Sequence, residues 1–308
     1  MHDCLVVIFN HRYDDNIIKI RKLYGERFDK IVMLMPFYDG KDPDVIPVYE
    51  SSFQFEGYLI QAYEKLREID ADNYIFIGDD VCLHPELSGE NIERFLNFYE
   101  KKVFIATLYR INTPYQFAWP SSRDSSIPFF QRGTRWKSSV PDYADALKCF
   151  EEFYGEKYNE EYTDAFFEGR CDGEEDEEHR RAVEAFLKAN RNTRKIPYPM
   201  GWGYCDFFVI TREQLFSISR LCGVFSAMNM FVEIAIPTAI ILTTRRKDVV
   251  LLPETGYKWE LYWGDKRKEF EDKYHKDVGY LYENWNPKTL FVHPVKLSAW
   301  SLEKGKNK

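Results

Sequence analysis

The stretch Tyr74-Ile75-Phe76-Ile77-Gly78-Asp79-Asp80-Val81 decides the fold. Its first four residues are apolar and predict a short buried strand that ends at Gly78. Two carboxylates follow directly. Ligands of open α/β sheets bind at the carboxyl ends of the strands, and two adjacent acids there suit a hard divalent cation that carries phosphate oxygens. Aspartates that merely cap a turn would explain the same residues.

The first 108 residues alternate apolar strands with amphipathic helices. Strands are expected at 5–9, 30–35, 45–49, 74–77 and 103–108, and helices at 14–24, 53–69 and 89–99. This alternation predicts an α/β fold with a central, mostly parallel sheet flanked by helices. The motifs GxGxxG and GxxxxGK[ST] are both absent, which excludes the usual dinucleotide fingerprint and the P-loop.

Residues 109–200 have a different character, because aromatic residues between Tyr115 and Trp136 alternate with prolines. This pattern predicts irregular structure, followed by helices at 143–153 and 179–190. Exposed aromatic rings bind the faces of sugars well, but the same rings also pack loops. Both interpretations of the aromatic stretch stay open at this point.

The last third of the chain returns to regular elements. A segment with two glycines around Trp202, ending in Asp206, precedes a strand at 207–210. Thr211 is a good N-cap for a helix that we expect to end at Gly223. Glu233 lies in the apolar run 231–242, a late strand is expected at 249–252, and the final apolar run 290–296 contains His293 and Lys296.

Composition narrows the class of protein. The 308 residues suit one large domain or two small ones, and 44% hydrophobic content is enough for a packed core. A formal net charge of −8 argues against nucleic-acid binding. Six scattered cysteines without CxxC spacing favour a reducing compartment. Without a signal-peptide or membrane-span pattern, we expect a cytoplasmic protein, free or peripheral at the inner face of a membrane.

With these elements placed, the chain resembles a GT-A-type glycosyltransferase, a nucleotide-sugar-dependent enzyme. The resemblance rests on the alternating first half, the Asp79-Asp80 pair, the glycine-flanked Trp202 with Asp206, Glu233 and His293. It implies a Rossmann-like GT-A fold. Residues 1–108 would form the nucleotide-sugar-binding α/β half, and residues 109–308 the acceptor-binding and catalytic half of the same domain.

The resemblance also implies roles for individual residues. The departing diphosphate needs positive charge, from a divalent cation or from clustered basic groups. Asp80 and His293 would hold Mn²⁺ or Mg²⁺, and the imidazole favours Mn²⁺. Because the acid motif reads Gly78-Asp79-Asp80 instead of D-x-D, a metal-independent variant stays open, with Lys296, Arg245 and Arg246 as the basic side chains.

The remaining candidates would contact the two substrates. Nucleotide binding is expected from Asn10, His11, Arg12, Asp39 and Asp79, and acceptor binding from Trp202 and Lys296. Glu233, between Val232 and Ile234, is the expected base, because desolvation raises the pKa of a carboxyl group and makes it a better proton acceptor. Asp206 is the second candidate for this role.

These assignments predict a hexosyltransferase that moves a sugar from a nucleotide-diphosphate donor, with UDP-sugar favoured, to a glycan or other sugar acceptor. Inversion at the sugar and a role in polysaccharide biosynthesis are expected. Two other functions stay open. A nucleotidyltransferase shares the sheet and the acid pair, and a non-catalytic carbohydrate-binding module would use the aromatic stretch without needing Asp80 or Glu233.

Overall fold

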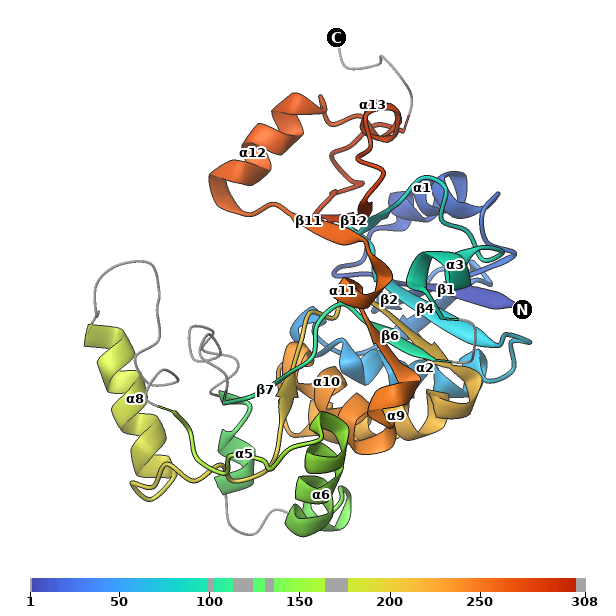
Figure 1. Cartoon of the computed structure of the whole chain (residues 1–308). Helices are drawn as coiled ribbons and strands as arrows, with labels where there is room; N and C mark the ends of the chain where they lie inside the picture. The colour runs from blue at the N-terminus through green and yellow to red at the C-terminus, as the bar shows by residue number, and fades with distance from the viewer. Residues whose placement is uncertain (1, 99–101, 113–123, 131–135, 164–176, 303–308) are drawn as a thin grey trace.

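A seven-stranded sheet forms the centre of the molecule. The computed structural model describes residues 2–98, 102–112, 124–130, 136–163 and 177–302 (Figure 1). The strands follow the order β10-β6-β9-β4-β1-β2-β3. Their bounds are β1 Asp3–Ile8, β2 Lys30–Pro36, β3 Val45–Val48, β4 Asn73–Gly78, β6 Val103–Ile105, β9 Phe207–Thr211 and β10 Val249–Leu251. Only β9 runs antiparallel to its neighbours, β4 and β6. The predicted mixed α/β fold with a mostly parallel sheet is confirmed.

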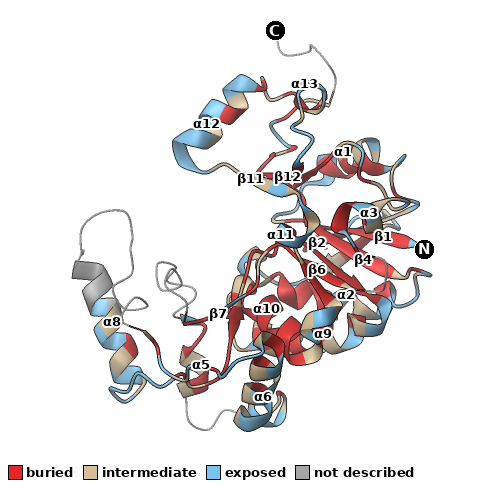
Figure 2. Cartoon of the chain, in the orientation of Figure 1, coloured by how far each residue is buried: buried red, intermediate tan, exposed pale blue. Residues whose placement is uncertain are grey.

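Helices cover both faces of this sheet, which explains why its strands are almost continuously apolar. Along β1, Cys4, Val6 and Ile8 belong to one core, while Leu5 and Val7 belong to the other. The first core is closed by α2 (Glu56–Leu66), α9 (Arg212–Ala227) and α10 (Val232–Thr243), and the second by α1 (Asp14–Tyr24) and α3 (Ile92–Leu96). Figure 2 shows the sheet as a buried layer between these helices.

A second sheet connects the end of the chain to the first half. It has the order β11-β12-β5, with β5 at Cys82–Leu83, β11 at Lys258–Leu261 and β12 at Thr289–His293. Strand β12 pairs antiparallel with β5, which follows β4 after only three residues. This pairing brings the carboxyl end of β12 beside the Asp79-Asp80 turn. The helices α11 (Leu252–Thr255), α12 (Gly264–Lys273) and α13 (Val278–Glu283) belong to the same C-terminal part.

The irregular middle of the chain forms an arm beside the central sheet (Figure 1). It contains the two-stranded pair β7 (Tyr109–Arg110) and β8 (Gly201–Trp202) and the helices α5 (Ile127–Phe130), α6 (Tyr143–Tyr154) and α8 (Glu177–Ala189). Phe129 stacks on Tyr198 at 4.7 Å between ring centroids, and the Trp136 ring contacts both. Tyr115, Phe117 and Trp119 lie outside the described residues.

Two local predictions were wrong. The helix expected at 89–99 is only Ile92–Leu96 and ends at Asn97, which has a positive φ of 53°. Helix α9 does not stop at Gly223 but continues to Ala227. A Cβ at Gly223 would lie 2.6 Å from Ile60 Cγ2, so this glycine lets α9 approach α2 closely. Among the helices of the described ranges, none has the length and apolarity needed to span a membrane.

Candidate functional site

The strand order reverses beside β1, because the chain proceeds from β1 to β2 on one side and β4 lies on the other. In open α/β sheets, ligands bind at this reversal, outside the carboxyl ends of the strands. The loop after β1 and the turn after β4 meet here. The backbone N–H of Asn10 donates a hydrogen bond to Asp79 Oδ1 at 3.2 Å. The acid pair therefore lies where the topology favours a ligand.

Asp80 is held between two basic side chains from the end of the chain. His293 Nε2 lies 3.2 Å from Asp80 Oδ1, and the Lys296 ammonium contacts Asp80 Oδ2. The backbone N–H of Val295 also donates to the Asp80 carbonyl at 2.6 Å. Asp80 is only 2% exposed and His293 is also buried. Asp80 thus lies in the turn after β4 with its carboxylate buried and paired, and its role as a metal ligand stays a prediction.

The two adjacent aspartates have opposite electrostatic properties. Burial alone would raise the pKa of Asp80, but His293 and Lys296 outweigh it and lower that pKa to about 2. Burial and the neighbouring Asp80 charge raise the pKa of Asp79 to about 7. Burial lowers the pKa of His293, yet the contact with Asp80 raises it above its ordinary value overall. At neutral pH, Asp80 is therefore ionised, whereas Asp79 is partly protonated.

Two further acids lie beside this group. Asp206 immediately precedes β9, whose antiparallel direction places its start at the carboxyl end of β4, and Gly78 N–H donates to the Asp206 carbonyl at 2.9 Å. Glu233 is in the first turn of α10. Burial and the Asp206 charge raise the pKa of Glu233 to about 8, and burial also raises the pKa of Asp206. A raised pKa makes the ionised form of each of these carboxyl groups a better proton acceptor.

The glycines around Trp202 fix the position of Glu233. Gly203 N–H donates to the Glu233 carbonyl at 2.9 Å. A Cβ on Gly203 would lie 2.0 Å from the Thr107 carbonyl oxygen, so a side chain cannot fit there without moving backbone. Trp202 itself is half-buried and stacks on Tyr109 at 5.0 Å. This packing accounts for the unusual sequence segment, and an acceptor-binding role for Trp202 stays a prediction.

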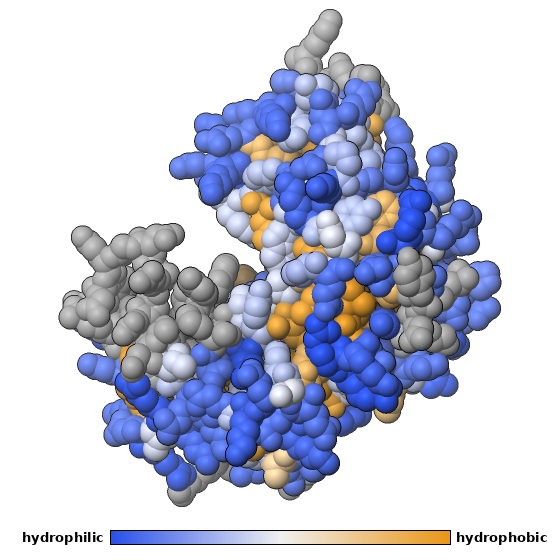
Figure 3. Space-filling view, viewed as in Figure 1, coloured by the Kyte–Doolittle hydropathy of each residue, from blue (hydrophilic) through white to orange (hydrophobic). Residues whose placement is uncertain are grey.

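An aromatic wall beside His293 was missed by the sequence analysis. The ring centroid of Trp263 lies 5.1 Å from that of His293. The ring centroid of Tyr204 also lies near His293, at 5.9 Å. Trp263 is 58% exposed, between β11 and α12. The sequence alone offered no signal for it, because both the exposure of Trp263 and its proximity to His293 depend on the β11-β12 pairing. Figure 3 shows an apolar area at the surface beside the lobe that carries α12.

The other predicted site residues lie farther from Asp80, either along the carboxyl edge of the central sheet or away from that edge. Arg12 pairs with Asp39 at 2.7 Å, and both side chains are solvent-accessible. His11 is exposed and its ring lies 6.3 Å from that of Tyr13. Arg245 and Arg246 pair instead with Asp248 and Glu254, in the region of η4 (Arg246–Asp248) and α11. Of the three basic residues proposed against the diphosphate, the structure brings Lys296 to Asp80.

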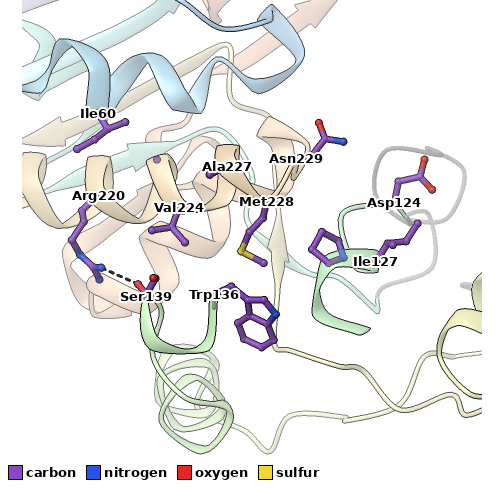
Figure 4. A pocket seen from close by; sticks show the side chains of 12 residues that line it. Ile60, Asp124, Ile127, Trp136, Ser139, Arg220, Val224, Ala227, Met228 and Asn229 are labelled. Atoms are coloured by element: carbon purple, nitrogen blue, oxygen red, sulfur yellow. Dashed lines mark hydrogen bonds between the residues drawn. The ribbon is translucent and has the colours of Figure 1, made fainter. Parts of the chain in front are cut away.

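One cavity among the described residues lies away from this acidic group. A cavity of about 960 Å³ lies between α9 and the segments 124–128 and 136–139 (Figure 4). Ile60, Trp136 and Met228 line it, and Arg220 bridges to the Ser139 carbonyl at 2.9 Å. None of the acids described above lines this cavity. The candidate site is therefore identified by its chemistry and topology, and not by volume.

The resemblance implies a divalent metal, and the residues offer it two donor atoms. Asp80 Oδ1 is buried without a hydrogen bond, and His293 Nε2 faces it. Across residues 2–98 and the other described ranges, no three His, Cys, Asp or Glu side chains are grouped to hold a metal ion. Such an ion takes most of its ligands from oxygen atoms, including phosphate and water. Metal binding by Asp80 and His293 therefore stays a prediction, in which most of the other ligands would be phosphate or water oxygens.

Comparisons with known proteins give little further evidence. No protein-family model matches the sequence, and no curated protein matches it. Among solved structures, the fold is similar to the crystal structure of core-mannan synthase A from Aspergillus fumigatus in its Mn/GDP form. That similarity covers 82% of this chain and 73% of that chain, at 8% sequence identity and a TM-score of 0.35. A likeness this weak carries no argument about activity.

The Asp80–His293 pairing predicts a measurable change in the imidazole. In Asp80→Asn, the charge that raises the pKa of His293 is lost while burial remains, so we expect that pKa to fall below the ordinary value of 6.5. NMR titration of the imidazole measures it. The exposed Asp39→Asn is the matched control and should leave the His293 pKa unchanged. An unchanged pKa in Asp80→Asn would show that the two side chains do not interact in solution.

Proposed function

We propose that the protein is a glycosyltransferase that moves a sugar from a nucleoside-diphosphate donor to a hydroxyl of a glycan or other sugar acceptor. One observation carries the proposal. The strand reversal at the carboxyl edge gathers a carboxylate of low pKa, the basic side chains of His293 and Lys296, and two carboxyl groups with raised pKa values. Such a group can neutralise a leaving diphosphate and accept a proton from an acceptor.

The donor would bind at the carboxyl ends of the strands in residues 1–108, and a UDP-sugar is the favoured donor. Asp79 and the Asn10 backbone lie at the strand reversal, and the partly exposed Lys296 ammonium can turn toward a phosphate oxygen. Asp80 and His293 would hold Mn²⁺ or Mg²⁺, and a bound ion would supply positive charge to the leaving phosphate. Lys296 contributes positive charge in either case. The half from 109 to 308 would bind the acceptor, and a cytoplasmic location remains part of this proposal.

Glu233 is the proposed base. Its carboxylate would take the proton of the acceptor hydroxyl as that oxygen forms a bond to the sugar carbon, while the bond from this carbon to the diphosphate oxygen breaks. Attack from the face opposite the leaving group inverts the configuration. The Glu233 carbonyl is fixed by Gly203 N–H, and its raised pKa of about 8 matches the task of accepting a proton near neutral pH. Asp206 is the alternative base.

A non-catalytic binding module is less well supported by this geometry. Buried acids with raised pKa values cost folding free energy, because the unfolded chain solvates them freely. A module that only holds a glycan would not need Glu233 or Asp206 in this state. A nucleotidyltransferase stays the second enzymatic candidate, and product analysis separates it, because it releases pyrophosphate instead of a nucleoside diphosphate.

Nucleotide binding is the first test. We expect calorimetry to detect binding of UDP, more weakly of GDP and CMP, with affinity increased by Mn²⁺. Lys296→Met should weaken UDP binding with or without Mn²⁺, because it removes positive charge from the diphosphate. Lys247→Met, at an exposed lysine in η4 away from Asp80, should bind like the wild type. If no nucleoside diphosphate binds under any of these conditions, the proposed function is wrong.

The base is tested by Glu233→Gln, which keeps the size of the side chain and cannot accept the proton. We expect an unchanged melting temperature and donor affinity, and a rate constant about a hundredfold to ten-thousandfold lower. The wild-type kcat/KM should fall as the pH drops below about 8, because protonation of Glu233 removes the base. Glu213→Gln, in the first turn of α9, is the control. Full activity of Glu233→Gln would transfer the role to Asp206 or remove the need for a base.

A further inference from the structure

Phe37 is in a strained conformation and exposes its ring. It directly follows β2, and its φ of 52° lies in the left-handed region. For a residue with a bulky side chain this backbone conformation is costly, and such strain persists where the surrounding structure or a function maintains it. Phe37 N–H donates to the Val48 carbonyl at 2.8 Å, which holds the backbone in place. The ring is nevertheless 63% exposed, so core packing does not explain the strain.

A second exposed ring lies against Phe37. Tyr49 directly follows β3 and is also 63% exposed. The two ring centroids are 5.9 Å apart and the ring planes meet at 73°, in an edge arrangement. We call Phe37 and Tyr49 the aromatic platform. Because both rings remain largely accessible, the face of a single ring of the platform is available to a ligand at the carboxyl edge of the sheet.

The aromatic platform is continuous with the candidate site. Strands β4, β1 and β2 are neighbours, and the loop after β1 contacts the residues that follow both of the others. Asn10 N–H bonds to Asp79, and Arg12 Nη1 donates to the Phe37 carbonyl at 3.4 Å. Two strand spacings separate the acid pair from the platform, about 10 Å. A nucleoside diphosphate whose phosphates lie at Asp80 has the length to reach the platform with its base.

We propose that the platform stacks on the nucleobase of the donor, an inference that rests on the proposed function. A nucleobase is flat and has polar edges. A ring face of the platform can stack on the base. The Arg12–Asp39 ion pair, next to Phe37, supplies hydrogen-bond donors and acceptors for the polar edge of the base. This assignment also explains the strain, because the left-handed backbone at Phe37 directs an aromatic ring outward at the end of β2. The earlier candidates Arg12 and Asp39 then border the base instead of carrying it.

The test compares ring removal at Phe37 with ring removal elsewhere. Stacking on an aromatic side chain predicts that Phe37→Ala weakens UDP binding about 5- to 150-fold in calorimetry. Binding of pyrophosphate, which has no base, should be unchanged. Phe53→Ala is the matched control, because Phe53 is 67% exposed in η1 (Ser52–Gln54) without a positive φ. It should bind UDP like the wild type.

Phe37→Gly separates stacking from packing. Glycine adopts the left-handed conformation without strain, so the variant should melt at or above the wild-type temperature and still lose UDP affinity. A melting temperature several degrees lower, or equal loss of UDP and pyrophosphate binding, would assign the ring to structure. Unchanged UDP affinity in both Phe37 variants would overturn the inference, even if the wild type binds UDP. Absence of UDP binding by the wild type would instead overturn the proposed function.

Discussion

The burial of one negative charge organises the site. The Asp80 carboxylate is removed from water at the end of β4, and an unpaired buried carboxylate would be expensive. His293 and Lys296 compensate for it. These two residues come from the end of the chain, more than 200 positions away, so the pairing ties the β11-β12-β5 sheet to the strand reversal. The site is therefore complete only when the C-terminal part is in place.

The charge arrangement separates the tasks of neighbouring acids. The pKa of Asp80 stays low because His293 and Lys296 contact it. At Asp79, Asp206 and Glu233, desolvation outweighs the effect of these basic side chains, and the pKa values are raised. Pairs of titratable groups with pKa values moved apart in this way are typical of acid–base sites. Raised pKa values of this kind lower the stability of the fold at neutral pH. Glu233 binds its proton more tightly in the fold than in the unfolded chain, so its contribution to stability declines as the pH rises from about 4.5 toward 8.

The sequence contained enough information to place the sheet and the acid pair. Buried parallel strands are continuously apolar, so the run before Gly78 identified β4, and topology then put Asp79 and Asp80 at the ligand-binding edge. Gly223 was misread, because a glycine that allows two helices to touch looks like one that ends a helix. Trp263 and Phe37 could not be assigned, since their exposure and neighbours depend on the register of β11 with β12 and on the backbone after β2. Lys296 was a candidate, but only the structure distinguishes it from Arg245 and Arg246.

The central claim is that the Asp80 group at the strand reversal binds a nucleoside diphosphate. A crystal structure of the protein with UDP tests this most directly. We predict the diphosphate within hydrogen-bond distance of Lys296 Nζ and the uracil ring on Phe37. A nucleotide bound elsewhere, for example at the hollow lined by Arg245, Arg246 and Lys247, would contradict the account.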